Sequence, residues 1–240
     1  MTAEGRELAS VALVLVSHSG ALAEGAAELA GQMAPGVLVV PVGGLEDGLL
    51  GTDYARIEKA VARAAGEGRS VVVLTDLGSA VLTTEAVLEM TDPEVAARVA
   101  LADAPFVEGA VAAAVTAHGG ASPAEVLASA VHAGSLFGTG QPEPTVGEFD
   151  EGTVDGVVRA SRTLLNPLGL HARPAAVVAR MLAGYDAQVA VNGVNAASVL
   201  ELMKLGATQG AQLRIEASGP QASAAVDALT AAIDAGFGEL

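Results

Sequence analysis

A histidine and an arginine stand two residues apart in a stretch whose composition suits a phosphoryl group. Residues 169–174 (GLHARP) place His171 at the predicted start of a helix, where proline is tolerated because the first helical N–H groups have no intrahelical partner. Those N–H groups and the positive end of the helix dipole favour an anion, and the Arg173 guanidinium adds a fork of donors. Since a neutral imidazole is nucleophilic, His171 could carry a phosphoryl group in transit. A histidine that only caps the helix is the alternative, which the adjoining Arg and Pro disfavour.

A second histidine, His18, directly follows the apolar run 11–16 and precedes a glycine, a pattern that predicts a strand, a short loop and a helix. Asp76 follows another apolar run, 71–74. Its carboxylate could accept a hydrogen bond from one ring nitrogen of His18, which would fix the tautomer and leave the other nitrogen free to attack phosphorus. From the spacing alone, a loop histidine and a helix-capping aspartate are an equally good interpretation.

The composition argues against several other kinds of chemistry. The chain has no cysteine, hence no disulfide or thiol nucleophile, and its four histidines lack the spacing of zinc ligands. Residues 20–27 carry two glycines at the separation found in a P-loop, but Ala26 and Ala27 stand where Lys and Ser or Thr are required. We therefore expect no metal and no bound cofactor, and a phosphoryl group that arrives from another protein.

The charge of the chain disfavours nucleic acid and anionic membranes as partners. There are 28 acidic and 12 basic residues, for a net charge of −16. The net charge is −11 over residues 1–140, −5 over 141–158 and 0 over 159–240, so it changes where a change of domain is expected. The acidic start lacks the basic region of an export signal, and every long apolar stretch is interrupted by charges. We expect a cytoplasmic protein.

Strand-like and helix-like segments alternate over residues 1–135, which predicts an α/β domain with a doubly wound, mostly parallel sheet. Ligands bind such sheets beyond the carboxyl ends of the strands, where His18, Gly43-Gly44 and Asp76 are expected to meet. The predicted strands are 11–16, 37–41, 70–75 and 99–102, and the predicted helices are 21–33, 54–65, 83–90, 105–118 and 123–133.

Residues 136–158 are acidic and rich in glycine and proline, which predicts a solvated linker. Residues 159–240 then predict a smaller α+β domain. Ser198 is expected to cap a short helix and Gly206 to end it. The predicted strands of this domain are 159–165, 187–191, 194–196 and 211–217, and its predicted helices are 172–183, 198–205 and 221–235.

The sequence NPLGLHARPA at residues 166–175 resembles the active-site signature of HPr, the histidine phosphocarrier of the bacterial phosphoenolpyruvate-dependent phosphotransferase system (PTS). The resemblance covers about residues 159–240 and implies an HPr-like open-faced β-sandwich. It further implies that His171 is phosphorylated, with Nδ1 (the pros nitrogen) as the candidate atom, and that Arg173 steadies the phosphate.

Residues 1–135 resemble the mannose-type IIA (EIIA) domain, in the version found in the DhaM family, the phosphotransferase subunits of dihydroxyacetone kinase systems. The supporting motifs are VSHS at 16–19, GTD at 51–53, TDLGSA at 75–80 and PFVEGA at 105–110. The resemblance implies that His18 is a second phosphorylation site, with Nε2 (the tele nitrogen) as the candidate atom and Asp76 orienting the ring. The fusion of this domain to an HPr domain is itself typical of that family.

The resemblance implies a phosphotransferase subunit that relays a phosphoryl group. The group would pass from phosphoenolpyruvate through enzyme I to His171, then to His18, and then to ADP on the DhaL subunit, which acts on dihydroxyacetone bound to DhaK. Some family members continue into a part of enzyme I, whereas this sequence ends at Leu240, so a separate enzyme I is the expected donor. A homodimer through the first domain is also expected.

Two alternatives to this relay stay open. One is an EIIA component that serves a sugar-transporting PTS, which would require membrane partners. The other is a regulatory module whose phosphorylation switches its binding to another protein, which would require a stable phosphohistidine.

Overall fold

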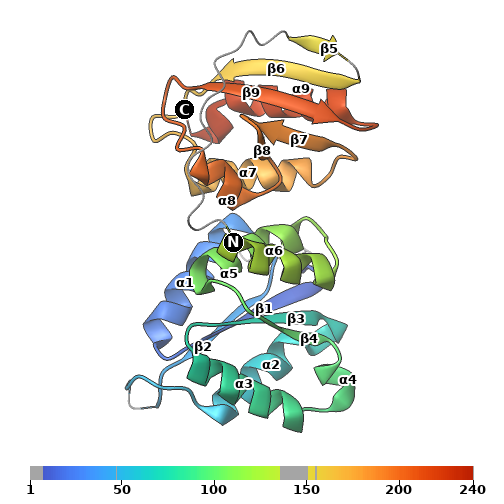
Figure 1. The fold of residues 1–240 in the computed structure, drawn as a ribbon. Coiled ribbons are helices and arrows are strands. Elements are labelled where there is room, and N and C mark those ends of the chain that lie inside the picture. Colours follow the sequence, from blue (N-terminus) through green and yellow to red (C-terminus); the bar gives the residue numbers. More distant parts are fainter. Residues whose placement is uncertain (1–7, 47, 136–150, 155, 240) are drawn as a thin grey trace, which may run out of the picture. The chain divides into compact units, whose positions relative to one another are not determined.

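The structure is a computed structural model that describes residues 8–46, 48–135, 151–154 and 156–239. The chain divides into two compact units, unit 1 (1–137) and unit 2 (138–240) (Figure 1). Most of the predicted linker, residues 136–150 and 155, lies outside the described residues. Across the part of the chain that is described, none of the helices combines the length and the apolar character needed to cross a bilayer.

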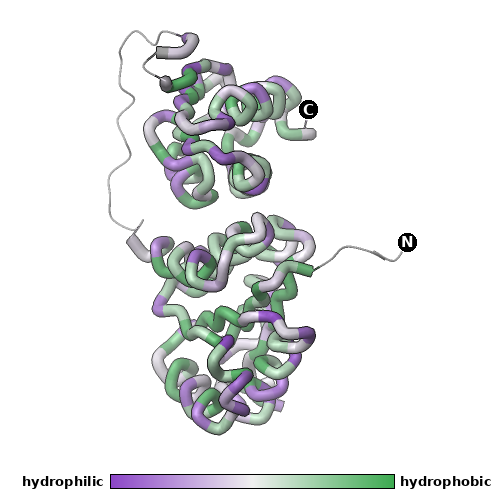
Figure 2. The backbone as a smooth tube through the Cα atoms, turned by 90° about the vertical axis from the view of Figure 1, so that its right-hand side faces the viewer, coloured by the Kyte–Doolittle hydropathy of each residue, from purple (hydrophilic) through white to green (hydrophobic). Residues whose placement is uncertain are grey.

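Unit 1 contains a parallel sheet whose strands lie in the order β2 (Val39–Gly43), β1 (Val11–Ser17), β3 (Ser70–Thr75) and β4 (Val99–Ala102) (Figure 1). The central strands are apolar runs that are buried almost throughout, because helices cover both faces of a sheet of this kind. Figure 2 shows the same hydrophobic segments in the interior of unit 1. The predicted α/β class with a parallel sheet is confirmed.

Helices cover the two faces of this sheet in separate layers. Helices α1 (Gly20–Met33), α5 (Phe106–His118) and α6 (Pro123–Ser135) share a core with Leu13 and Leu15 of β1. The intervening residues of β1 pack on the opposite face, in a core shared with α2 (Tyr54–Ala64) and α3 (Gly78–Met90). This alternation follows from the period of two residues along a strand.

Two helical segments of unit 1 differ from the prediction. Helix α3 begins at Gly78, five residues before the predicted start at 83, because Ala80 is fully buried and anchors a first turn that looks like a loop in the sequence. A short helix, α4 (Pro93–Ala96), was not predicted. Asp92 accepts a hydrogen bond from Glu94 N and caps it, and Pro93 occupies its first position.

Unit 2 contains an antiparallel sheet in the order β5 (Gly152–Val154), β6 (Val157–Thr163), β9 (Gln212–Ser218), β7 (Gln188–Val191) and β8 (Val194–Asn195) (Figure 1). Alternate residues of β9 are buried and their neighbours are more exposed, as expected for a sheet covered on one face. The helices are α7 (Ala172–Leu182), α8 (Val199–Lys204) and α9 (Ala222–Asp234). The predicted mixed architecture of this part of the chain is confirmed.

The carboxyl end of the predicted linker 136–158 is a hairpin, so this part of the linker prediction was wrong. Strand β5 pairs antiparallel with β6, which begins at Val157. Between them Gly156 has a φ of +78°, a conformation that favours glycine. The acidic composition of the segment predicts a solvated linker, whereas the short β5–β6 pairing depends on contacts with the neighbouring strand.

Both predicted boundary residues of the short helix α8 are confirmed. The Ser198 hydroxyl accepts a hydrogen bond from Glu201 N at 3.4 Å. Gly206 follows the last turn with a φ of +55°, the left-handed conformation that commonly ends a helix.

Candidate phosphorylation sites

His18 and Asp76 lie at the carboxyl edge of the unit 1 sheet, where the strand ends converge. Ser17 of β1 pairs with Gly43 of β2, and Asp76 N donates to Val16 O at 3.2 Å. A Cβ atom on Gly43 would lie 2.5 Å from Ser17 O, so this close approach of two backbones requires glycine. The predicted meeting of these strand ends is confirmed.

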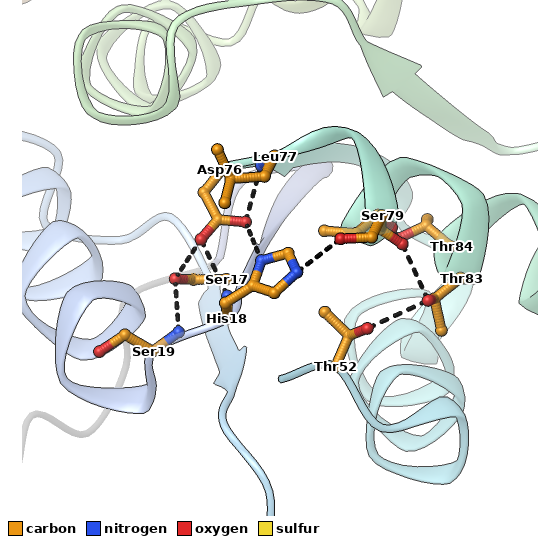
Figure 3. A network of polar contacts seen from close by, with 10 residues as sticks. Ser17, His18, Ser19, Thr52, Asp76, Leu77, Ser79, Thr83 and Thr84 are labelled. Atoms are coloured by element: carbon orange, nitrogen blue, oxygen red, sulfur yellow. Dashed lines mark hydrogen bonds and ion pairs between the residues drawn. The ribbon is translucent and has the colours of Figure 1, made fainter. Parts of the chain in front are cut away.

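The Asp76 carboxylate accepts four hydrogen bonds from the loops around His18 (Figure 3). Oδ1 accepts from the His18 ring at Nδ1 (2.9 Å) and from Leu77 N (2.8 Å), and Oδ2 accepts from His18 N and the Ser17 hydroxyl, both at 2.8 Å. Burial raises the pKa of this carboxyl, but the hydrogen bonds from His18 and Ser17 outweigh burial and hold the pKa below its ordinary value of 3.8. The carboxylate is therefore ionised at neutral pH, and it holds a proton on Nδ1 of His18.

The other ring nitrogen of His18 faces the first turn of α3. Nε2 lies 2.7 Å from the Ser79 hydroxyl, which donates to it when the ring proton is on Nδ1 (Figure 3). The N-cap residue Leu77 supplies no side-chain cap, so the first N–H groups of α3 and its positive end are available to an anion. Behind Ser79, Thr83 Oγ1 donates to Ser79 O (2.9 Å) and lies 3.1 Å from Thr52 Oγ1.

Two exposed leucines lie in the segments that contact His18 and Asp76 through their backbones, and the His18 side chain is 21% exposed. Gly51 N donates to His18 O at 2.9 Å, which places the loop after β2 beside the histidine, as expected from the resemblance. Leu50 in this loop is 74% exposed, and Leu77 next to Asp76 is 61% exposed. Exposed leucines in these segments suit contact with another protein.

In unit 2, His171 is the N-cap residue of α7, as predicted. Its Nδ1 accepts a long hydrogen bond from Arg173 N at 3.4 Å, and Pro174 is buried in the first turn. Gly169 has a φ of +71°, and a Cβ atom there would lie 2.3 Å from Ala207 O, so the preceding loop requires glycine. The Arg173 residue is exposed. The geometry therefore directs Nδ1 toward the positive end of a helix beside an accessible guanidinium.

Three residues around these histidines were not assigned a role from the sequence. Glu239 Oε2 lies 3.2 Å from Nε2 of His171 and accepts a hydrogen bond from Asn166 Nδ2 at 2.8 Å. Ser79 and Asn166 both stand inside motifs that the sequence made visible, but no role was assigned to them. Glu239 is 68 residues from His171, so no local pattern could have revealed it.

Both units match families of the phosphotransferase system. Residues 12–127 match the family described as the PTS system fructose IIA component, and residues 158–235 match the PTS HPr component phosphorylation site. The fold and the sites thus define a PTS protein in which an EIIA unit is joined to an HPr unit.

Relatives that match nearly the whole chain, or one part of it, identify the family more closely. The "PEP-dependent dihydroxyacetone kinase, phosphoryl donor subunit DhaM" of Klebsiella michiganensis is 35% identical over 95% of this chain and 51% of the relative. The "PEP-dependent dihydroxyacetone kinase 2, phosphoryl donor subunit DhaM" of Listeria innocua is 37% identical over 44% of this chain and 84% of the relative. The chain belongs to the DhaM family.

Further matches cover part of the chain or part of the relative. A solved structure of HPr-C-His from Thermoanaerobacter tengcongensis is 35% identical over 34% of this chain and 97% of that chain, with a TM-score of 0.33. The DhaM of Escherichia coli is 34% identical over 95% of this chain. The chain spans about half the length of the curated relatives that match nearly all of it.

Proposed function

We propose that this protein carries phosphoryl groups from the PTS to a dihydroxyacetone kinase. The group passes from phosphoenolpyruvate through enzyme I to His171, then to His18, and then to ADP bound to DhaL, which phosphorylates dihydroxyacetone held by DhaK. The observation that carries the proposal is the geometry of His18, since an ionised carboxylate holds one ring nitrogen while the other faces a helix N-terminus. The names of the relatives, phosphoryl donor subunits of a PEP-dependent kinase, support the destination.

Phosphorylation of His18 requires no proton transfer in this arrangement. The lone pair of Nε2 attacks phosphorus while the donor N–P bond breaks, and the donor imidazole keeps the electron pair. Because Nδ1 retains its proton, the phosphorylated ring becomes positively charged, and the Asp76 carboxylate 2.9 Å away stabilises it. The Ser79 hydroxyl, released from Nε2, then donates to a phosphoryl oxygen together with the first N–H groups of α3.

At His171 the proposed nucleophile is Nδ1. This atom accepts a hydrogen bond from a backbone N–H, which can only donate, so Nδ1 carries the lone pair. A phosphoryl group bound there lies at the positive end of α7, within the reach of the flexible Arg173 side chain. Both histidines therefore combine a nitrogen that holds a lone pair with a helix N-terminus that stabilises the incoming charge.

The proposed partners are enzyme I as donor, DhaL–ADP as acceptor with DhaK as its kinase partner, and a second copy of this chain. Two observations support self-association through unit 1. Strand β4 lies at the edge of the described sheet, where backbone groups can pair with another chain. On the neighbouring α3, Leu82 and Met90 are 67% and 76% exposed.

A transfer assay with labelled phosphoenolpyruvate and enzyme I tests the relay. The intact chain is compared with His171→Ala and His18→Ala, each with and without DhaL–ADP. We expect His171→Ala to take up no label, and His18→Ala to be labelled but unable to pass the label to DhaL. If His18→Ala still transfers its label to DhaL, His18 is not an intermediate and the proposed mechanism is wrong.

A further inference from the structure

We propose that Asn166 and Glu239 are positioning residues that set the tautomer of His171 and thereby select Nδ1 as its reacting nitrogen. The consequence for phosphoryl transfer rests on the proposed function, whereas the effect on the tautomer does not. The inference is drawn from the contacts of three side chains that the loop before α7 and the segment after α9 bring together.

The two contacts of the His171 ring agree on one tautomer. A backbone N–H donates to Nδ1, so this atom holds a lone pair and the neutral ring carries its proton on Nε2. Nε2 then donates to Glu239 Oε2 at 3.2 Å. The side chains of His171 and Glu239 are 34% and 20% exposed, so the carboxylate is partly shielded while the ring stays accessible. An ionised carboxylate can only accept hydrogen bonds, so its contact with Nε2 favours the same tautomer.

Asn166 holds the carboxylate in place from the interior of unit 2. This residue is fully buried, and its Nδ2 donates to Glu239 Oε2 (2.8 Å) and to Gly236 O (2.9 Å). Gly236 opens the short 3-10 turn Gly236–Gly238 that leads to Glu239. The backbone O of Asn166 accepts from Gly169 N in the loop that leads to His171. Asn166 therefore fixes both the acid and the loop that carries the histidine.

The side-chain oxygen of Asn166 makes no hydrogen bond within the described part of the chain, so the residue contributes through the two hydrogen bonds that its Nδ2 donates. Oδ1 is buried and has no hydrogen-bond partner among the described residues. Leaving a buried acceptor unpaired destabilises a protein, so an apolar residue would serve packing better. Turning the amide over would direct Oδ1 at two acceptors, Gly236 O and Glu239 Oε2, so the observed orientation of the amide is the favourable one.

During the proposed reaction the Glu239 carboxylate stays hydrogen-bonded to Nε2 of His171. The bond between Nδ1 and phosphorus forms, the N–P bond of the donor breaks, and the donor nitrogen takes the electron pair. Nε2 keeps its proton, so the phosphorylated ring is positively charged and Glu239 stabilises that charge. On transfer to His18 the electron pair of the Nδ1–P bond returns to Nδ1, and the starting tautomer is restored.

The test is nitrogen NMR of the full chain with labelled histidine, at about pH 8.5. We compare wild type with Glu239→Ala and Asn166→Ala. Asp227→Ala is the matched control, because it removes an exposed acid from α9 without touching the site. The rate of His171 phosphorylation by enzyme I is measured on the same samples, and thermal unfolding shows whether each variant folds.

We expect wild type and Asp227→Ala to hold the His171 proton on Nε2. In Glu239→Ala we expect a mixture of tautomers and a rate lower by about 10- to 100-fold, with the His18 signals unchanged; Asn166→Ala should move both readouts in the same direction. An Nδ1–H tautomer of His171 in wild type, or an unchanged tautomer in Glu239→Ala, would overturn the inference. If wild type takes no label from enzyme I, the proposed function fails, while the NMR comparison still decides whether Glu239 sets the tautomer.

Discussion

At the residue scale, the proposed mechanism makes the charge of Asp76 decide which nitrogen of His18 reacts. Asp76→Asn keeps the shape of the side chain, but an amide can donate to Nδ1 as well as accept from it, so the proton can move to Nε2. We expect transfer from His171 to His18 to slow by about 10²- to 10⁴-fold, in the range seen when an orienting carboxylate of a histidine is replaced. Single-turnover transfer within the labelled chain measures this rate. Labelling of His171 is the internal control and should not change; an unchanged transfer rate would contradict the assigned role.

The same carboxylate makes the stability of unit 1 depend on pH. Its pKa in the folded protein is below the ordinary value of 3.8, so its ionised form stabilises the fold above that pH, and this contribution is lost as the pH falls through the folded pKa. We expect the difference in free energy of unfolding between wild type and Asp76→Asn to shrink as the pH is lowered below about 4. Urea unfolding at a series of pH values measures it. A difference that stays constant down to pH values at which both proteins begin to unfold would argue against the lowered pKa.

Ser79 is expected to affect the phosphorylated state more than the resting ring. Ser79→Ala removes one donor to a phosphoryl oxygen, while Asp76 still fixes the tautomer of His18. A hydrogen bond to a charged group contributes about 1.5–3 kcal/mol, so phosphorylation of His18 should weaken by about 10- to 100-fold. The equilibrium distribution of label between His171 and His18 measures this effect. Thr83→Ala is the control, because it removes a hydroxyl from the same helix that bonds Ser79 O and not the ring; equal effects of both variants would exclude a direct role for Ser79.

At the scale of elements, a glycine allows the loop that carries His171 to lie against the backbone of Ala207. Gly169 and Gly210 both have positive φ, but only at Gly169 would a Cβ atom collide, 2.3 Å from Ala207 O, whereas nothing lies within 4 Å of a Cβ atom at Gly210. Gly210→Ala should therefore cost about 1–2 kcal/mol for its backbone conformation. Gly169→Ala should cost about 1–3 kcal/mol more through overlap. Denaturant unfolding of unit 2 within the full chain compares the two, and equal costs would contradict the close approach.

The elements also show which parts of this structure a sequence can predict. Strands β1 and β3 are uninterrupted apolar runs, so their burial and the convergence of His18 with Asp76 were predictable. The first turn of α3 was not predictable, because Gly78 and Ser79 favour a loop locally. Only the burial of Ala80 in the core stabilises this turn as part of the helix. Ser79 and Glu239 reach their histidines across 61 and 68 residues. Contacts of this kind depend on how the chain folds back, which local spacing does not encode.

At the scale of the whole molecule, the difference in charge between the units should make the relay sensitive to salt. Residues 1–140 carry a net charge of −11, whereas residues 159–240 are neutral overall and place Arg173 two residues from His171. The Arg173 guanidinium complements the acidic charge of residues 1–140; local complementarity of this kind accelerates encounter, and salt screens it. We therefore expect transfer between separate chains to slow as the ionic strength rises.

Two variants make this transfer between chains measurable. His18→Ala, labelled on His171, is mixed with unlabelled His171→Ala, so that label reaches His18 only by passing from one chain to another. The second-order rate constant should fall several-fold or more between about 0.05 and 0.5 M salt, because the Debye length shrinks over this range. Transfer within intact wild type should be less sensitive, since the tether already supplies a high effective concentration. A rate constant between chains that does not change with salt would mean that apolar contacts, such as those available at the exposed Leu50 and Leu77, govern the encounter instead.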